Sequence, residues 1–403
     1  MPHLPFAFRL ATALVKLALL AANGHLFWTL HRKAGQRGWK AASWAALACM
    51  PVGFALLGCS EMFRWDEAWL GVQREPGFWR LASSVWTFGL FGSYCVALFW
   101  RLARRLHRVG RQRGEAAPEG RAGSARPSRR HVVTTLARAT VGAPFALAAY
   151  GTFIGREQFE LREVELVFPN LPESLDGLRI AQITDIHAGP YLAVKEVERV
   201  VAMANETRPH LTVVTGDLIT REGDPLEQTI QRLAALKADA GVWGCMGNHE
   251  EFARCLSFTE VCGRKNGIEF LRGRRQKLRF GDATLNLAGV DYQWQTRPYL
   301  VRTGELLEPG AFNLLLSHNP DVFPRAAELG YDLVLGGHTH GGQVTVEIVE
   351  QWVNPGHFFT PFVAGEYHID NSALYVSRGI GTVNLPMRIG ALPEVTLVRL
   401  KRA

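Results

Sequence analysis

The sequence predicts a chain of two parts: an N-terminal helical transmembrane region over residues 1–155 and a C-terminal α/β domain over residues 156–403. Three observations support this fold class. Four long apolar stretches lie before residue 155, and short apolar runs alternate with helix-period segments after residue 175. Charge is also unevenly divided, because residues 1–155 contain 20 Lys or Arg and 6 Asp or Glu, whereas the remaining residues contain 25 and 31.

The four apolar stretches cover residues 10–30, 41–58, 81–100 and 132–153. A membrane-spanning helix needs about 20 mainly apolar residues, so each stretch is long enough or nearly so. The third is free of charged residues and is bordered by tryptophans, which membrane interfaces favour. Four buried helices of a soluble domain are the alternative, but such long helices would then show a polar face. We therefore expect an integral protein of the cell or inner membrane, with the lipid bilayer as a partner.

The charges between these stretches predict an orientation. The first loop has four basic residues and no acidic one, and residues 101–130 contain ten arginines and two glutamates. The latter segment is also rich in Gly, Pro, Ala and Ser, so we expect a basic disordered loop. The positive-inside bias puts both loops in the cytoplasm and, after four spans, the C-terminal domain on the non-cytoplasmic side. The pair Arg129-Arg130 resembles a twin-arginine export signal, although an arginine-rich loop can contain such a pair by chance.

The C-terminal part shows the pattern of an α/β domain. After a polar approach segment, runs at 178–183, 211–214 and 242–246 are typical of buried strands, with helix-period segments at 192–204 and 226–238 between them. This alternation predicts βαβ units and a largely parallel sheet. Seven later runs between residues 278 and 400 are strand-like, with fewer helices between them. They indicate a second sheet packed on the first, so we expect an α/β sandwich.

Polar residues follow five of the predicted strands directly. They stand in Thr184-Asp185-Ile186-His187, Gly216-Asp217, Gly247-Asn248-His249-Glu250, Ser317-His318 and Gly336-Gly337-His338-Thr339-His340. Because ligands of open α/β sheets lie at the carboxyl ends of the strands, we expect these side chains to gather at one edge. Their oxygen and imidazole donors, without cysteine, suit Mn²⁺, Fe²⁺ or Zn²⁺. Any one of them could simply shape or cap a turn, but the five together indicate a metal centre.

These five motifs, in this order, resemble those of the calcineurin-like metallophosphoesterase superfamily, and the resemblance extends over residues 175–401. The apolar N-terminal region, the run His318-Asn319-Pro320-Asp321 and Gly341-Gly342-Gln343 are most similar to its branch of membrane-associated or exported bacterial phosphodiesterases. The resemblance implies a four-layer α/β sandwich, the metallophosphoesterase fold. It also implies a metal-dependent phosphoric ester hydrolase, a phosphodiesterase or phosphatase, with two divalent metal ions.

The roles of individual residues are also implied by the resemblance. One ion would be held by Asp185, His187 and His340, and the second by Asn248, His318 and His338, with Asp217 bridging the two. His249 would be catalytic, protonating the leaving oxygen or stabilising the transition state. Two ions about 3.5–4 Å apart lower the pKa of a water between them, so the expected reaction is attack by a metal-bridging hydroxide.

The metal ligands do not distinguish a phosphodiester from a phosphomonoester or a pyrophosphate. The acidic C-terminal part makes long nucleic acids poor partners. The short connection to the last apolar stretch, together with Phe358 and Phe359, favours a lipid-linked phosphate ester. His357 beside them could wall the pocket or have no function.

Two other classes of function remain open at this point. One is a catalytically inactive metal-binding sensor that signals through the spans, and the other is a transporter with an accessory soluble domain. The complete set of seven ligands and His249 favours the enzyme over the sensor. The few charged residues within the apolar stretches argue against a transport pathway.

Overall fold

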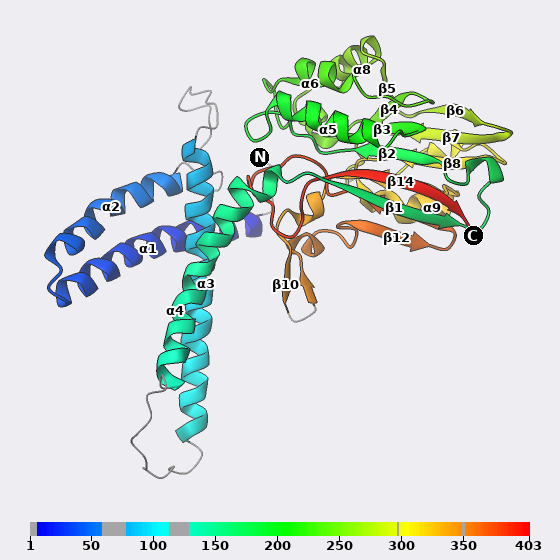
Figure 1. Cartoon of the computed structure of the whole chain (residues 1–403). Helices are drawn as coiled ribbons and strands as arrows, with labels where there is room; N and C mark the ends of the chain where they lie inside the picture. Colours follow the sequence, from blue (N-terminus) through cyan, green and yellow to red (C-terminus); the bar gives the residue numbers. More distant parts are fainter. Residues whose placement is uncertain (1–5, 59–77, 113–128, 296–297, 349–350) are drawn as a thin grey trace. The chain divides into compact units, whose positions relative to one another are not determined.

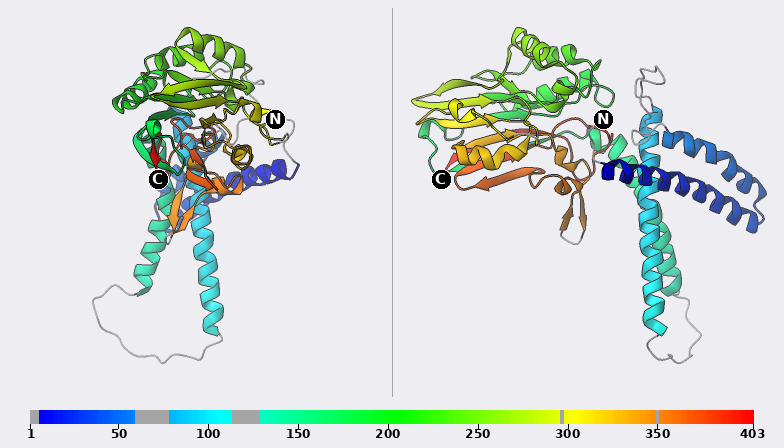
Figure 2. Two further views of the ribbon diagram at one scale, coloured as in Figure 1. Left: turned by 90° about the vertical axis from the view of Figure 1, so that its right-hand side faces the viewer. Right: turned by 180° about the vertical axis from the view of Figure 1, so that it is seen from behind.

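The structure is a computed structural model that describes residues 6–58, 78–112, 129–295, 298–348 and 351–403. The chain divides into two compact units, Met1–Phe153 and Ile154–Ala403. The first unit is built of long helices, and the second combines sheets with shorter helices (Figures 1 and 2). Each unit is described by itself below.

The described part of the N-terminal unit consists of four helices: α1 (Phe6–Gln36), α2 (Lys40–Gly58), α3 (Phe78–Gln112) and α4 (Arg129–Phe153). Each predicted apolar stretch lies within one of them. Within the described residues, the segments Ala13–Gln36, Lys40–Leu57 and Phe78–Leu106 are long and apolar enough to cross a membrane, and α4 is not among them. These helices indicate a membrane-integrated protein.

The predicted basic loop begins later than expected. Residues 101–112 continue α3 as helix, which corrects the expectation of a loop from residue 101. This part of the sequence has no proline, and Leu102 and Leu106 are spaced by one helical turn. The rest of the predicted loop, residues 113–128, lies outside the described residues.

Polar groups and small residues join the helices of this unit. The indole Nε1 of Trp86 on α3 donates to Oδ1 of the buried Asn23 on α1 at 3.1 Å, and the Tyr94 hydroxyl donates to the Ala22 carbonyl at 2.8 Å. Gly89 on α3 faces the ring of Phe145 on α4 so closely that a side chain there would collide with it. Such close approach and interhelical hydrogen bonding are typical of helices in membranes.

The C-terminal unit contains two six-stranded sheets and, among its described residues, a two-stranded hairpin. The first sheet has the order β1 (Glu160–Phe168), β14 (Glu394–Arg402), β2 (Arg179–Ile183), β3 (Leu211–Thr215), β4 (Val242–Cys245), β5 (Ile268–Phe270). The second has the order β12 (Gly365–Ile369), β13 (Ser372–Val376), β9 (Leu333–Gly336), β8 (Phe312–Leu316), β7 (Ala283–Gly289), β6 (Arg274–Phe280). The hairpin pairs β10 (Val346–Ile348) with β11 (Gln351–Val353).

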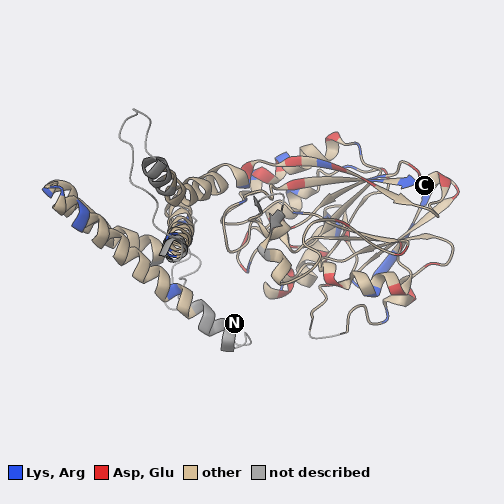
Figure 3. Ribbon diagram, turned by 90° about the horizontal axis from the view of Figure 1, so that it is seen from below, with Lys and Arg blue, Asp and Glu red and all other residues tan. Residues whose placement is uncertain are grey.

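Strand direction explains where a site can form. In the first sheet β2, β3, β4 and β5 pair in parallel, and in the second β7, β8, β9 and β13 do so. Loops after parallel strands leave the sheet at the same edge, which is where α/β proteins place their ligands. Charged residues are spread over the helices and loops of this unit (Figure 3).

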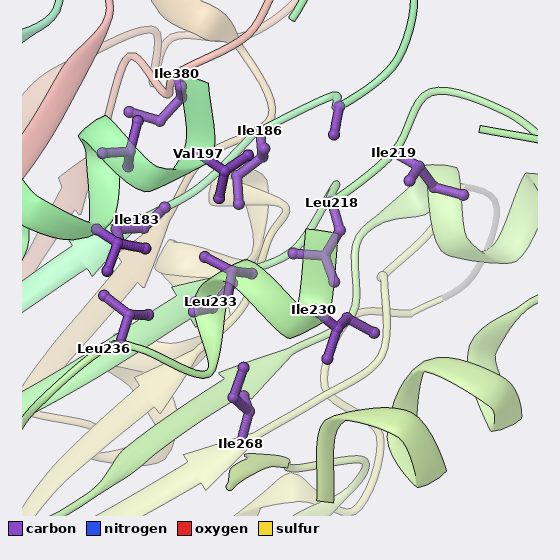
Figure 4. Close-up of a cluster of buried hydrophobic side chains, with 14 of the residues drawn as sticks. Ile183, Ile186, Val197, Leu218, Ile219, Ile230, Leu233, Leu236, Ile268 and Ile380 are labelled. Carbon is purple, nitrogen blue, oxygen red and sulfur yellow. The ribbon is translucent and has the colours of Figure 1, made fainter. Parts of the chain in front are cut away.

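Helices of this unit lie on the outer faces of the two sheets, and one short helix begins at the carboxyl end of β4. The helices are α5 (Val194–Glu206), α6 (Leu226–Leu233), α7 (Asn248–Phe252), α8 (Leu256–Lys265) and α9 (Phe323–Leu329). One buried cluster joins the first sheet to α5, α6 and α8, with Ile183, Val197, Ile230 and Ile268 among its members (Figure 4). It forms because Ile183 and its neighbours alternate along the strands between the outer and inner faces.

Two further clusters complete the layers. Ile180 and Val213 of the first sheet meet Leu285 and Leu314 of the second between the sheets. On the far side of the second sheet, Phe323 of α9 packs against residues of β8 and β13. The unit is therefore a four-layer α/β sandwich, helices–sheet–sheet–helix, as expected.

The polar approach segment is a strand, which corrects the sequence interpretation. Residues 160–168 form β1, which pairs in parallel with β14 along its whole length. Its sequence Glu-Leu-Arg-Glu-Val-Glu-Leu-Val-Phe mixes four charged with five apolar residues, and only Leu166 and Phe168 are buried, because the strand lies at the edge of the sheet. The short strands β5 and β12 were likewise not predicted, since three and five residues carry little periodic signal.

Candidate metal centre

The structure brings seven of the eight predicted site residues into one cluster, and the eighth, Asn248, directly precedes His249 of that cluster. Asp185 and His187 follow β2, Asp217 follows β3, His318 follows β8, and His338 and His340 follow β9, while Asn248 and His249 begin the helix α7 after β4. Both sheets therefore contribute to one cluster. His249 and His338 are half-buried, and the other six are buried.

Asp217 contacts histidines from both sheets. Its Oδ2 is 2.9 Å from His318 Nε2 and 3.5 Å from His187 Nε2. Asp185 Oδ1 is 3.2 Å from His340 Nε2, and the Nε2 atoms of His187 and His340 are 3.1 Å apart. Ring nitrogens and carboxylate oxygens that converge so closely are arranged as they would be around a shared cation.

The donor atoms form three overlapping groups in which all ligand atoms lie within 4.8 Å of one another: Asp185, His187 and His340; His187, Asp217 and His249; Asp217, His318 and His338. Asn248 adds an amide, and its Oδ1 is buried without a hydrogen-bond partner. A buried amide oxygen in this state is costly unless something other than a hydrogen bond satisfies it. The donor set and this unpaired oxygen fit divalent metal ions.

The backbone at the cluster is strained. Five of the seven predicted ligands adopt the left-handed conformation, which non-glycine residues rarely use: Asp185 (φ 52°), His187 (47°), Asp217 (56°), His338 (73°) and His340 (53°). Each such residue costs on the order of 1–3 kcal/mol, and strain of this kind concentrates at functional sites. The loops are therefore shaped to aim side chains, at the expense of local backbone stability.

Hydrogen bonds at the ring Nδ1 atoms orient three of the histidines. The Nδ1–H of His318 donates to the carbonyl of Thr215 at 2.6 Å, and that of His249 donates to the carbonyl of Thr220 at 2.5 Å. The hydroxyl Oγ1 of Thr220 lies 3.2 Å from His187 Nδ1. With Nδ1 engaged, Nε2 of each ring is left for the cluster, as is usual for metal-binding histidines.

A buried carboxylate holds the loops of the first sheet. Glu250 is fully buried, and it accepts hydrogen bonds from the backbone N–H of Gly247 at 2.8 Å, Asp217 at 3.0 Å and Leu218 at 2.7 Å. Burial raises the pKa of Glu250, and the nearby Asp217 charge raises it further. Glu250 thus ties the loop after β3 to the loop after β4.

A buried guanidinium holds a loop of the second sheet. Arg388 is fully buried and donates to the carbonyls of His340 at 2.7 Å, Gly381 at 2.5 Å and Ala391 at 3.2 Å. Its Nη2 lies 3.1 Å from His340 Nδ1. Burial lowers the pKa of Arg388 to about 9, which still leaves it charged at neutral pH. Arg388 therefore fixes both the backbone and the ring of His340.

Burial and neighbouring charges shift the pKa values within the cluster. Burial lowers the pKa of His187 and of His338 to about 3, so both are neutral at pH 7. Burial opposes the charge of His318, but the carboxylates of Asp217 and Asp185 outweigh it and raise the His318 pKa to about 10. Burial also raises the pKa of Asp185 to about 6. The two carboxylates therefore favour positive charge at the position of His318.

His249 lies at the rim of this cluster. Its ring centroid is 4.7 Å from that of His187 and 5.6 Å from that of Phe252. Its backbone N–H donates to Asp217 Oδ1 at 2.9 Å, so the ring leaves the backbone next to that carboxylate. This position is within reach of both the cluster and a group bound over it.

Some site residues were not found from the sequence. Thr220, Arg388 and Tyr292, whose hydroxyl lies 3.1 Å from His338 Nε2, stand outside the five motifs and carry no sequence signal of their own. Conversely, His357 is exposed and belongs to none of the described groups of metal-type ligands. A cavity of about 560 Å³ beside Tyr299 and Leu329 contains none of the cluster residues.

Comparisons with known proteins identify relatives of this chain. The model of a family described as calcineurin-like phosphoesterase matches residues 178–342. A transmembrane protein with metallophosphoesterase domain from Danio rerio is 30% identical over 349 residues, covering 82% of this chain and 76% of its own. The Bacillus subtilis uncharacterized metallophosphoesterase YkuE is 28% identical over a match that covers 62% of this chain and 89% of the relative. An uncharacterized metallophosphoesterase from Aquifex aeolicus is 30% identical, with coverage of 64% and 98%.

The match to the Danio rerio protein also involves the helical unit. It covers more of the chain than the unit Ile154–Ala403 contains, so it extends into the residues before that unit. The relative is named as a transmembrane protein, and a match over 82% of this chain must include the apolar segment Phe78–Leu106.

Proposed function

The chain belongs to the calcineurin-like phosphoesterase family, and on this basis we propose that it is a membrane-anchored hydrolase of phosphate esters that uses two divalent metal ions. The observation that supports the proposal most is the convergence of carboxylate and imidazole groups around Asp217. Mn²⁺, Fe²⁺ and Zn²⁺ all suit these donors.

The proposed ligands divide into two sets with one shared member. Asp185, His187 and His340 would hold the first ion. Asn248, His318 and His338 would hold the second, and Asp217 would contact both. The short distances from Asp217 to His187 and His318, one from each set, support the bridging role. The unpaired Oδ1 of Asn248 supports its assignment as a ligand.

Two such ions, when bound, supply an activated water at neutral pH and offset the charge of the phosphate oxygens. The protein's own residues would then orient the substrate and protonate the departing alcohol. His249, held by Thr220, would present Nε2 to the oxygen of the departing alcohol and donate a proton to it. Because its Nδ1–H is already engaged by the Thr220 carbonyl, only Nε2 is free for this transfer.

We further propose that the helical unit spans the membrane four times and that the hydrolase domain lies on the non-cytoplasmic side. The basic residues of the first and third loops support this orientation. A reporter enzyme fused after residue 403 tests it: activity confined to the cytoplasm would overturn the topology. Replacing Arg129 and Arg130 by lysine tests the export signal separately, since unchanged localisation would reduce the pair to ordinary positive charge.

For the substrate, a lipid-linked phosphodiester, phosphomonoester or pyrophosphate is the favoured class. The helix α4 ends at Phe153, and the first strand of the hydrolase domain begins at Glu160, so few residues connect them. Phe358 and Phe359 are highly exposed, at 88% and 76%. Aromatic residues on a domain with so short a connection suit substrates at a lipid surface.

The test uses the full chain reconstituted in lipid nanodiscs, stripped of metal with a chelator and reloaded with Mn²⁺. We expect two ions per chain by elemental analysis, and hydrolysis of bis(4-nitrophenyl) phosphate that disappears and returns with the metal. A screen of membrane phospholipids follows with the same preparation. Two bound ions without hydrolysis of any phosphate ester would contradict the proposal and favour the inactive sensor.

A further inference from the structure

Three aromatic side chains stand in a row beside the proposed metal centre: Phe252 at the end of α7, and Tyr292 and Trp294 in the loop after β7. We infer that these residues, the aromatic wall, form a subsite for the substrate's leaving group and select leaving groups that carry an apolar chain. The inference rests on the proposed function, because it assigns a substrate class to the same site.

The rings of the wall form a continuous series of contacts. The centroid of Phe252 is 5.6 Å from that of His249 and 5.4 Å from that of Trp294. The centroid of Tyr292 is 4.7 Å from that of Trp294 and 5.2 Å from that of His338. The wall therefore begins at a histidine supplied by the first sheet and ends at a histidine supplied by the second. It borders the cluster along one side.

Hydrogen bonds hold the middle of the wall, at Trp294, and one of its ends, at Tyr292. The indole Nε1 of Trp294 donates to the Glu251 carboxylate at 2.8 Å, and the Tyr292 hydroxyl lies 3.1 Å from His338 Nε2. Between them, the Asn319 side chain donates to the Gln293 carbonyl at 2.7 Å. A braced surface loses little conformational entropy when a ligand binds, which is what a recognition site requires.

The wall leaves apolar surface accessible next to the proposed proton donor. Phe252 is 60% exposed, while Tyr292 and Trp294 are half-buried. A single exposed phenylalanine is ordinary, but contiguous rings that adjoin a cluster of catalytic-type residues are characteristic of binding sites.

The chemistry of the wall favours an apolar leaving group. His249 is proposed to protonate the leaving oxygen. The group attached to that oxygen would therefore lie next to the His249 ring and the Phe252 ring that contacts it. Aromatic faces bind hydrocarbon chains through burial of apolar surface. The Glu251 carboxylate, which contacts Trp294, would repel an additional phosphate. The combination disfavours nucleotide leaving groups with further charge and favours the alcohol of a lipid.

The test compares three ligands with one phosphate group each: methyl phosphate, hexyl phosphate and adenosine 5′-monophosphate. Their inhibition constants are measured against hydrolysis of bis(4-nitrophenyl) phosphate by the Mn²⁺-loaded full chain in nanodiscs, with empty nanodiscs as a partition control. We expect hexyl phosphate to bind at least tenfold more tightly than methyl phosphate. Tenfold corresponds to about 1.4 kcal/mol, roughly what the burial of two methylene groups contributes.

Variants locate the preference. Phe252→Ala and Trp294→Ala should reduce the hexyl-to-methyl ratio to about twofold or less, because the chain then loses its contact surface. Trp294→Phe removes the bond to Glu251 but keeps an aromatic ring, so most of the preference should remain. Phe258→Ala is the matched control, since Phe258 is a half-exposed aromatic residue on α8. Melting temperatures confirm that each variant is folded.

The outcomes separate the wall from the proposed function. An unchanged hexyl-to-methyl ratio in both alanine variants would overturn the inference while hydrolysis persists. If adenosine 5′-monophosphate binds most tightly of the three ligands and Trp294→Ala abolishes this, the wall selects nucleotide leaving groups and not apolar chains. If the protein hydrolyses nothing, the proposed function fails, and titration calorimetry with the same ligands still decides whether the wall binds apolar chains.

Discussion

The two sheets contribute to the metal centre in different ways. Loops of the first sheet supply both carboxylates and the amide, Asp185, Asp217 and Asn248, whereas the second sheet supplies only histidines. The loops are also secured by opposite charges. Buried Glu250 collects backbone N–H groups on one side, and buried Arg388 collects backbone carbonyls on the other. In both cases a buried charged side chain holds the backbone of a loop in place. The carboxylate binds backbone N–H groups and the guanidinium binds backbone carbonyls, so the sign of the charge matches the backbone groups that need a partner.

The largest effect is expected at Asp217, which contacts histidines from both sheets. Asp217→Asn keeps the size of the side chain and removes the charge that faces His187 and His318. We expect loss of both ions and a fall in kcat/KM on the order of 10³-fold or more, because no other residue is proposed for both sites. Elemental analysis measures the metal, and Asp239→Asn, at an exposed aspartate, is the control. Full occupancy of both sites would refute the bridging role.

The next test removes a group from the first-sheet side alone. His249→Ala should lower kcat by roughly 10²–10⁴-fold on alkyl phosphate esters, whose alkoxide needs a proton, and much less on nitrophenyl esters. Both ions should stay bound. The measurement is kcat on both substrate types, with metal content determined in the same preparation.

Two results would contradict this role of His249. An equal loss on both kinds of ester would favour charge stabilisation over proton donation. Loss of metal together with activity would move His249 into the ligand shell, where it would be the third member of a group with His187 and Asp217.

A third test addresses the second-sheet side. Arg388→Lys keeps the charge but cannot reach several carbonyls as the planar guanidinium does. We expect metal affinity to fall by about 10–100-fold at the site that contains His340, with the other site unchanged. Metal titration of the stripped protein should then show one weak and one unaltered ion. Equal weakening of both sites would show that Arg388 stabilises the whole unit instead.

Glu250→Gln is the counterpart of that variant on the first sheet. The amide can no longer accept every backbone N–H that the carboxylate accepts, so we expect the free energy of unfolding to fall by about 1–3 kcal/mol. Denaturant titration of the metal-free chain measures it. A free energy of unfolding equal to that of the wild type would show that Glu250 does not hold these loops in place.

The smallest effect is expected at Thr220. Thr220→Val removes the hydroxyl near His187 Nδ1 and retains the carbonyl that accepts from His249. We expect less than a tenfold fall in kcat/KM, with KM nearly unchanged, because one orienting contact is lost and no ligand is removed. Thr229→Val, at a buried threonine on α6, is the matched control. A loss as large as that of His249→Ala would mean that the loop itself has moved.

Much of this arrangement could be predicted from the sequence, because short apolar strands followed at once by Asp, Asn or His indicate both sheet and site. Arg388 could not, since it contacts His340 from a loop that lies 48 residues later and belongs to no motif. Strand β1 was missed because its charged residues belong to an exposed edge, which hides the apolar signal. Local pattern therefore predicts the ligand loops, whereas the residues that support them depend on tertiary packing.

The position of β14 has a consequence for biosynthesis. This strand, formed by residues 394–402, lies between β1 and β2 and pairs with both. The first sheet consequently remains open, with β1 unpaired, until the ribosome has added residue 402. The hydrolase domain must therefore complete its folding after translation of β14, when α1 to α4 have already been synthesised. A nascent chain thus carries an unfinished sheet, and a nonsense mutation at residue 394 would leave that sheet without β14.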